Sequence, residues 1–545
     1  MKIPEAGERF EFYVDLMQKC NATRDDRKKH YNKWRSYFLT GGPANEPATK
    51  INKIYSHIEQ LCSLMYSSET TRFSVDLAPN ASDLHKPQIP ALMRAINEEW
   101  HLSNADAIFS MALMWSFVDG SRFVKLRIQG TEIESASVSA GDIGVLREDV
   151  QGLWRQEAFC HSYYITKSQL TYELEQLQDV PRLKNVLSQI VSAPKPNESS
   201  QTTTMDRIVT SASQPSVVGN VNFDLNADSS YRPKVAEELV QMYELYVFDD
   251  ELKDYRIVTI AQPGIVLFDR PLVEVFIKGE IPIVQICPNP AEDYFWGYSE
   301  TDKLIPLQDM RNTRMEQITH MLNLQANPPK YGSGFDGAAD EFADTMDSPG
   351  GLLMANMPGA KLEAMAPKVP EDLYKEIREI DSMFEEMSGI TNVIQGKGEQ
   401  GVRSQGHAAN LARLGSSRAK RKALLVEDSL EKLATLFLQL KQAYDPERLQ
   451  AEDGMQFIPE QFSKDFIVKV DGHSNSPIFM EDQRTLAFEL FKAQIIDGES
   501  VLELVDIPMK QLLKDRYKVM QAQKAAQAQA QQAAEAKQAT LKAVK

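Results

Sequence analysis

Apolar residues recur every three or four positions in three stretches of the first 120 residues, which is the spacing of helices that bury one face. The turn Gly41-Gly42-Pro43 ends the first stretch. Asp119-Gly120 ends the third and leads into a strand-like run, Phe123–Ile128. The pattern therefore predicts helices over residues 7–38, 49–67 and 86–118.

The middle of the chain changes to strand patterns after a polar segment. Residues 195–232 are rich in Ser, Thr, Asn and Pro, so we expect a long surface loop or a partly disordered insertion. Turn residues at Asp249-Asp250 and Pro263-Gly264 separate the apolar runs that follow. We predict an antiparallel meander with strands at Leu239–Phe248, Tyr255–Ala261, Ile265–Phe268 and Val273–Ile277.

Helical spacing returns beyond residue 290. One predicted helix of about 25 residues ends at Asn327-Pro328-Pro329. A second begins at Pro370-Glu371-Asp372, where proline and acids suit a first turn, and ends at Gly389. After the glycine-rich stretch Gly389–Gly406, the run His407–Tyr444 contains no proline. As one helix it would be about 57 Å long, so we expect it to cross a large assembly or lie between domains.

The C-terminal part combines a strand, a helix and a tail of low complexity. We predict a strand at Phe466–Val470 and an amphipathic helix at Gln483–Ile496. Residues Gln521–Ala539 are almost wholly Ala and Gln, which form helices well but provide no hydrophobic stripe. We expect this tail to be a solvated helix, a shallow contact between copies or a frayed end.

Composition limits the class of protein. The chain has 545 residues and a mass of 61.5 kDa, enough for more than one core. Its net charge of −17 argues against indiscriminate binding to nucleic acid or anionic lipid. Because no apolar run is long enough for a signal peptide or a membrane span, we expect no membrane partner and a location in the cytosol or in a particle assembled there. Widely spaced cysteines indicate a reducing compartment and buried thiols: Cys20, Cys62, Cys160 and Cys287.

The sequence carries no motif of catalysis or metal binding. Gly396-Lys397-Gly398 fails as a phosphate-binding loop, because glycine follows the lysine and Thr391 stands where a glycine is required. The eight histidines lack ligand spacing, which favours structural or surface roles. The acids between Asp336 and Asp347 lack the order of a calcium loop, which favours a solvated loop. We predict no enzyme activity, no catalytic residue, no metal and no cofactor.

One segment reverses the sign of the charge. Seven basic residues and a single acid, Glu399, lie between Gln395 and Lys422, a net charge of +6. Charge alone leaves two interpretations open, a solvated helix face with salt bridges to the acidic remainder or a contact with a polyanion. The seven are Lys397, Arg403, Arg413, Arg418, Lys420, Arg421 and Lys422.

The parts of the chain follow one another in a characteristic order. They are Tyr37-Phe38 with Gly41 and Asn52–Tyr55, a meander strand before Gly279–Val284, Gly297-Tyr298-Ser299, a helix ending in Asn327-Pro328-Pro329, a loop around Gly350–Leu353, a second helix with Ser388-Gly389-Ile390, a loop with Gln395-Gly396, then Arg403-Ser404 and a very long helix. This order resembles the portal proteins of tailed bacteriophages. The resemblance covers most of residues 7–510 and depends on order and spacing, because each motif alone is weak.

The resemblance implies an α+β, mainly helical subunit of a ring, typically of twelve copies, at one vertex of the capsid. DNA would be packaged and ejected through the ring. Partners would be the terminase packaging motor, capsid protein, tail or head-completion adaptors and non-specific double-stranded DNA, in a virion assembled in the host cytoplasm. The implied parts are the wing (1–293, with loop 195–232), first stem helix (294–327), clip (328–368), second stem helix (369–389), tunnel loop (390–406), long helix and wing return (407–506) and helical crown (507–545).

Within this arrangement we hypothesise that Gln395, Lys397 and Arg403 of the tunnel loop contact DNA without reading bases, because a glycine-rich loop gives reach but no rigid frame. DNA that slides must be held weakly, since each neutralised phosphate adds affinity. The other basic residues are predicted to make inter-subunit ion pairs or to line the channel: Arg413, Arg418, Lys420, Arg421 and Lys422.

Two alternatives stay open at the level of sequence. The first is another structural head-to-tail adaptor or head-completion ring protein that never contacts DNA. The second, less favoured, is a DNA-processing packaging enzyme, which would need a Walker-type loop or a carboxylate cluster at a strand edge.

Overall fold

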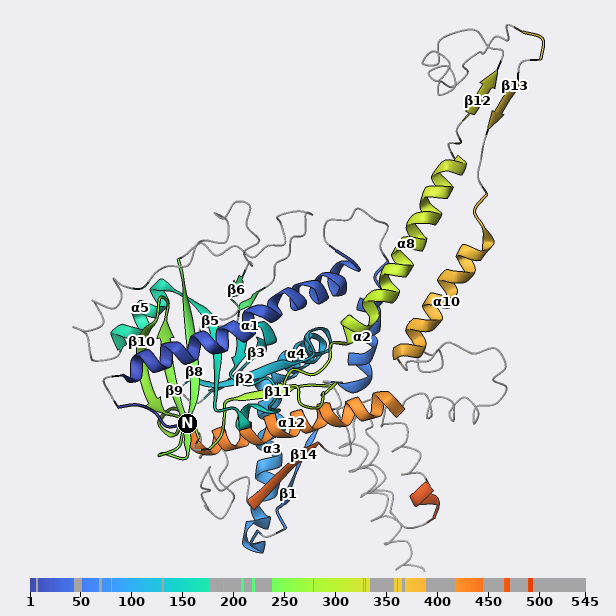
Figure 1. Ribbon diagram of the computed structural model, residues 1–545. Helices are drawn as coiled ribbons and strands as arrows, with labels where there is room; N and C mark the ends of the chain where they lie inside the picture. The colour runs from blue at the N-terminus through green and yellow to red at the C-terminus, as the bar shows by residue number, and fades with distance from the viewer. Residues whose placement is uncertain are drawn as a thin grey trace, which may run out of the picture.

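A body of helices and β-sheets carries a pair of helices that project away from it (Figure 1). This mixture of helix and sheet agrees with the predicted α+β class. The structure is a computed structural model and describes residues 1–5, 8–43, 51–67, 71–79, 81–129, 132–176, 190, 207–209, 218–220, 238–277, 279–326, 328, 330–333, 357–359, 361–364, 368–388, 417–444, 465–470 and 489–493.

Most of the helices lie within ranges that the apolar spacing predicts, but those over 167–176 and 272–275 were not predicted. The helices are α1 (Arg9–Thr40), α2 (Lys53–Met65), α3 (Ile89–Leu102), α4 (Ala105–Asp119), α5 (Lys167–Gln176), α7 (Leu272–Val275), α8 (Glu300–Ala326), α10 (Glu371–Ser388) and α12 (Ser417–Tyr444), with 3-10 turns η1 (Asp83–Gln88), η2 (Ala140–Asp142) and η3 (Leu153–Arg155). Within the described residues, no helix is long and apolar enough to cross a membrane.

The strands are β1 (Phe73–Leu77), β2 (Arg122–Gln129), β3 (Glu132–Ser139), β4 (Ile143–Val145), β5 (Ala158–Thr166), β6 (Arg207–Val209), β7 (Val218–Asn220), β8 (Leu239–Asp249), β9 (Asp254–Ala261), β10 (Ile265–Pro271), β11 (Ile283–Ile286), β12 (Lys330–Ser333), β13 (Lys361–Ala364) and β14 (Phe466–Val470). All pairings are antiparallel, in sheets ordered β10-β9-β8-β5-β4, β11-β2-β3, β1-β14, β12-β13 and β6-β7.

The conformations of single residues explain where the first predicted helix ends and why the third is divided in two. Helix α1 stops at Gly41, whose φ of 73° suits glycine and whose N–H bonds to the carbonyl of Tyr37. The predicted helix over 86–118 is two helices, because Asn104 takes a left-handed conformation with φ of 55° between α3 and α4. Asp119-Gly120 then turns the chain into β2, as predicted.

The predicted meander is present as β8, β9 and β10, but its fourth strand is wrong. Residues 272–275 form the short helix α7, and the N–H of Phe276 donates to the carbonyl of Leu272 at 2.7 Å. Leu272 and Phe276 are buried while Val273 and Val275 are exposed. Burial four residues apart matches a helical turn, so the apolar run reflects helical spacing rather than alternation.

Several predicted segments lie partly or wholly in residues that the structure does not describe. Within the expected loop 195–232, the strands β6 and β7 pair, and only those six residues are described. The first ten residues of the predicted helix over 407–444 lie outside the described residues, and the remainder is α12. Residues 489–492 are helical and residue 493 forms a turn within the predicted helix Gln483–Ile496, whose other residues, like the predicted crown, lie outside the described part.

The main core lies around α4 and the second half of α12. Trp100 of α3 packs against Phe73, Phe109 and Phe437, with ring centroids 4.9–6.3 Å apart. Leu430 and Phe437 of α12 are fully buried in the same cluster. A second cluster lies where α1 covers the five-stranded sheet. The body therefore holds α12 against it along most of that helix (Figure 1).

Candidate functional site

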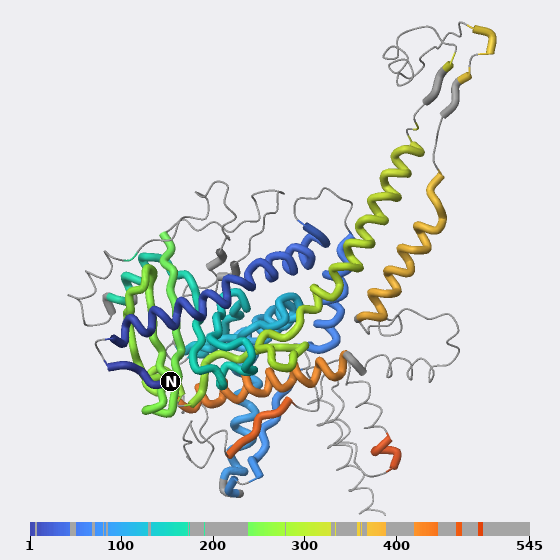
Figure 2. Tube along the Cα trace, in the orientation of Figure 1, coloured from blue at the N-terminus to red at the C-terminus, as the bar shows by residue number. Residues whose placement is uncertain are grey.

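The most distinctive feature of the fold is a stem, formed by α8 and α10 side by side (Figure 2). The first half of α8 belongs to the body, where Leu304, Ile305 and Leu307 are buried. The second half projects together with α10, which buries Ile380 and Phe384 on one face. Among the described residues, the stem is thus anchored to the body at one end only.

Charged side chains fasten the two stem helices to each other and to α2. Arg311 Nε of α8 lies 2.9 Å from Asp381 Oδ1 of α10. Lys53 Nζ of α2 lies 3.4 Å from Oδ2 of the same carboxylate. Farther out, Arg314 Nε is 2.8 Å from Glu376 Oε1. Asp381 therefore connects three helices at the foot of the stem, and Arg311 is itself buried.

A buried ion pair joins the start of α8 to α12. Lys422 Nζ lies 2.9 Å from Glu300 Oε2, and the side-chain amide of Asn289 donates to the same oxygen at 2.9 Å. Burial would raise the pKa of Glu300, but Lys422 and Lys303 hold it below its usual value. The contact fixes the early turns of α12 beside the foot of the stem.

A buried histidine lies close to this pair. Burial lowers the pKa of His57 to about 4, against the opposing effect of Glu300, so the ring is neutral at pH 7. Its Nε2 has no hydrogen-bond partner among the described residues. Protonation of His57 would place a charge in an apolar environment beside Lys422.

A hairpin lies at the far end of the stem. Strands β12 and β13 pair from Lys330 with Ala364 to Ser333 with Lys361. They follow α8 and precede α10, so the hairpin extends the stem away from the body (Figure 1). It lies within the predicted clip, and the acidic group between Asp336 and Asp347 lies outside the described residues.

The outer surface of the stem is more apolar than a solvated helix pair requires. Met383 and Met387, one turn apart on α10, are 44% and 45% exposed. Tyr374 of α10 and Met310 and Leu322 of α8 are exposed as well. Apolar side chains repeated at helical spacing outside a two-helix contact indicate a surface that packs against further helices.

The structure places only some of the predicted site residues. Gln395, Lys397, Arg403 and Arg413 lie outside the described residues. Arg418 lies in the first turn of α12.

The remaining three basic residues share the early part of α12 but differ in their surroundings. Lys420 is half-buried and Arg421 is exposed. Lys422 pairs with Glu300 of its own chain, and its role as an inter-subunit or channel residue stays a prediction. Its ion pair with Glu300 joins α12 to α8.

Sequence reasoning missed Glu300, Asp381 and His57, yet two of them left a signal. Ser299 begins α8 as a cap, accepting the N–H of Asp302 at 3.1 Å, and places Glu300 in the first turn. Asp381 follows Ile380 on the otherwise apolar face that α10 turns toward α8. An acid beside such a face indicates a partner on another helix.

Comparison with known proteins now identifies the family. Residues 141–473, more than half of the chain, match the family described as phage SU10 portal protein. The chain belongs to this family. The match runs through α8, the β12–β13 hairpin, α10, α12 and β14. It confirms the portal resemblance drawn from the order of motifs.

As a portal protein, the chain connects head and tail and is a component of the virion. Portal proteins are structural and not enzymes. A chain from a solved structure, "Neck of empty GTA particle computed with C6 symmetry", is 10% identical with a TM-score of 0.40, covering 88% of this chain and 93% of that chain. The search of curated proteins gave no match.

Proposed function

We propose that this portal protein forms a ring of twelve copies whose central channel passes double-stranded DNA during packaging and ejection. Helices α8 and α10 are the stem, the β12–β13 hairpin belongs to the clip, and residues 390–406 are the tunnel loop. Residues 1–293 form most of the wing, 407–506 the long helix and wing return, and 507–545 the crown.

The exposed apolar surface of the stem is the observation that carries this proposal. In a single chain Met383 and Met387 face water beyond the contact of α10 with α8. In a ring, the stems of adjacent copies stand side by side and cover these side chains. Burial of apolar surface at about 25 cal/mol per Å² then favours assembly.

The basic residues near the tunnel loop divide into two groups. Gln395, Lys397 and Arg403 contact the DNA backbone weakly and without base readout. Arg413, Arg418, Lys420 and Arg421 serve as inter-subunit or channel residues. Lys422 belongs to the same group, and within its own chain it pairs with Glu300.

The other surfaces of the ring bind protein partners. The clip meets the terminase packaging motor and later the tail or head-completion adaptors, and the wing contacts the capsid protein. Assembly takes place in the host cytoplasm. The motor supplies the energy of translocation, so the portal protein needs no catalytic residue and no cofactor.

Mass photometry and negative-stain microscopy of the purified chain test the ring. We expect closed rings with a central hole and a mass near twelve times 61.5 kDa. A chain that stays monomeric or dimeric across a series of salt concentrations would overturn the proposal.

The division of the basic residues has its own test. The double substitution K397A/R403A should leave ring mass unchanged and alter DNA retention in packaging assays. The control is K432A, which removes an exposed α12 lysine already paired with Asp428 at 2.5 Å. Loss of the ring in the double variant would show that the two residues serve assembly rather than DNA contact.

A further inference from the structure

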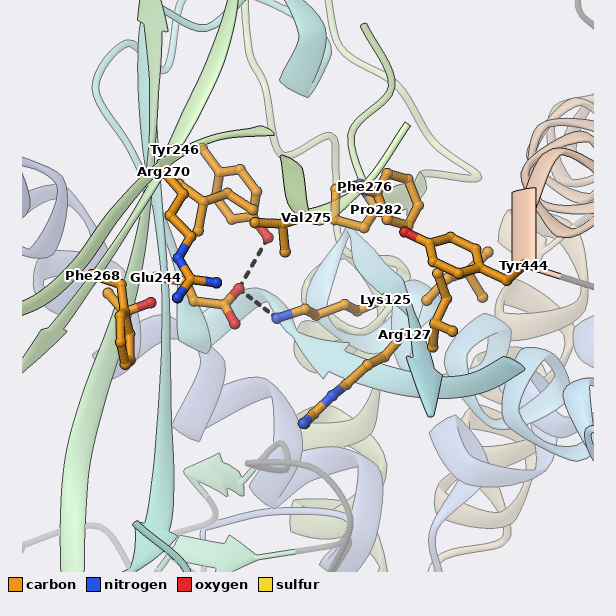
Figure 3. A pocket seen from close by; sticks show the side chains of 14 residues that line it. Lys125, Arg127, Glu244, Tyr246, Phe268, Arg270, Val275, Phe276, Pro282 and Tyr444 are labelled. Atoms are coloured by element: carbon orange, nitrogen blue, oxygen red, sulfur yellow. Dashed lines mark hydrogen bonds and ion pairs between the residues drawn. The ribbon is translucent and has the colours of Figure 1, made fainter. Parts of the chain in front are cut away.

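A cavity of about 510 Å³ lies between the two larger sheets of the body (Figure 3). Residues of β2 line one side and residues of β8, β9 and β10 the other. Val275 and Phe276, Pro282 and the last residue of α12, Tyr444, complete the lining. The volume falls in the range of small-molecule sites.

The interior end of the cavity is fixed by a buried ion pair. Lys125 Nζ of β2 lies 2.5 Å from Glu244 Oε2 of β8, and the hydroxyl of Tyr246 donates to the same oxygen at 3.0 Å. Burial would raise the pKa of Glu244, but Lys125 and His161 hold it well below its usual value. The charges of Lys125 and Glu244 therefore cancel.

Two further cations reach the cavity without a matching acid. Arg127 lies two residues after Lys125 on β2, so both side chains leave the same face of the strand and extend toward the opposite sheet (Figure 3). Arg270 comes from β10 on the other side. Neither arginine forms an ion pair with any residue that the structure describes, and Arg270 lies over the ring of Phe268 at 5.2 Å. The cavity thus carries two arginines that are outside any ion pair of the described residues, in a chain of −17.

The lining also offers apolar and aromatic surface. Tyr246, Phe268, Phe276 and Tyr444 contribute rings, and Val275 and Pro282 add aliphatic surface. A guanidinium group binds a phosphate through two parallel hydrogen bonds, and two such groups match the charge of a dianion. Aromatic walls favour a flat organic group attached to that phosphate.

We propose that this cavity binds a small aromatic phosphate monoester, with its phosphate between Arg127 and Arg270 and its ring against the aromatic walls. The site is separate from the stem and does not depend on the proposed channel. Lys125 and Glu244 act as a fixed, neutral floor that joins β2 of one sheet to β8 of the other.

Calorimetric titration of the full chain with phenyl phosphate, inorganic phosphate and benzyl alcohol tests the site. We expect phenyl phosphate to bind about tenfold or more tightly than inorganic phosphate, because the ring buries apolar surface. Benzyl alcohol, which has the ring but no charge, should show no binding. Equal binding of benzyl alcohol and phenyl phosphate would overturn the assignment.

Substitution of the two arginines locates the binding. R127Q and R270Q should each weaken phenyl phosphate binding about tenfold, since each removes a charge-assisted contact. Neither change leaves a buried charge unpaired, so thermal melting should be unaffected. The matched control is R155Q, which removes an arginine stacked on Trp154 at 4.5 Å outside the cavity. Unchanged affinity in both arginine variants would refute the site.

A further variant keeps all charges and fills the space. V275W places an indole in the lining of the cavity and should abolish phenyl phosphate binding.

The rival occupant is an acidic side chain of a second copy. If R127Q and R270Q change oligomeric mass while phenyl phosphate binding persists, the cavity is an interface between copies and the ligand proposal fails.

Discussion

The body and the stem of this portal protein differ in which side chains they bury. The body encloses a cluster of charged groups, whereas two methionines of α10, one turn apart on the stem, are in contact with water. In the body, Arg35 and Arg122 both reach the buried carboxylate of Asp119. The contrast supports the proposal that the body forms its core within one chain, while neighbouring copies cover the stem.

The charged cluster of the body joins α1, α4 and the strand β2. Arg35 Nη2 lies 2.7 Å from Asp119 Oδ2 and donates to Ser139 Oγ at 2.6 Å. Arg122 Nη1 lies 3.5 Å from the same carboxylate oxygen, and burial lowers the pKa of Arg122 to about 10 despite the opposing effect of Asp119. One carboxylate therefore supports two buried guanidinium groups.

The largest effect is expected for D119A. Removing this carboxylate leaves Arg35 and Arg122 buried and close together, which should lower the free energy of unfolding by about 4 kcal/mol. Urea denaturation followed by tryptophan fluorescence measures the change. The matched control is D149A, which breaks the exposed pair with Arg147 and should not change stability. Equal effects of the two substitutions would show that the buried carboxylate contributes no more to stability than an exposed one, which would contradict this view of the body.

A smaller effect is expected where the stem joins the body. D381A leaves the buried Arg311 without its carboxylate and detaches Lys53, at a cost of about 2 kcal/mol. Hydrogen exchange should rise throughout α10 but not in α1. E376A, which affects the more exposed pair with Arg314, should cost about 0.5 kcal/mol and serves as the control. Uniform exchange across body and stem in D381A would contradict the view of the stem as a separately attached unit.

The order of helices could be predicted from sequence because period and caps are local. Pro370-Glu371-Asp372 and the glycine at position 41 fix helix ends through their own chemistry. The pairing of β1 with β14 could not be predicted, because these strands lie nearly 400 residues apart and a five-residue strand carries no information about its partner.

The candidate site, like the fold, was predictable where it depends on local sequence and not where it depends on contacts between distant segments. Helices α8 and α10 follow from helix, loop, helix order, whereas the pairing of β12 with β13 was not predicted. The contact of Lys422 with Glu300 depends on how two helices pack, so the charge run alone suggested an outward role. Residues 272–275 show the same limit at short range, since their apolar run fits a strand or a helical turn equally.

Acid should weaken the body through its buried histidines. The pKa of His57 is about 4 in the folded chain and 6.5 in its ordinary state, so between these values the unfolded chain binds the extra proton. The free energy of unfolding therefore decreases as the pH is lowered, by about 1 kcal/mol for His57 between pH 7 and pH 5.5. H57Q should remove this share of the pH dependence of unfolding, measured by urea denaturation at both pH values. H320Q, at an exposed position on α8, is the control. The same slope in H57Q and the parent would contradict the assignment.

The smallest effect on the isolated chain is expected at the stem surface, and it is the most informative about assembly. M383E and M387E replace exposed side chains, so each should change the free energy of unfolding by less than about 0.5 kcal/mol. In a ring the same carboxylates would be buried without partners between adjacent stems, and the cost repeats at every interface. Mass photometry should therefore show monomers where the parent forms rings. L252E, at an equally exposed leucine in the turn between β8 and β9, should still assemble. Rings of full mass with M383E/M387E would show that the apolar stem surface faces something other than a neighbouring stem, and the contrast between body and stem would then need another explanation.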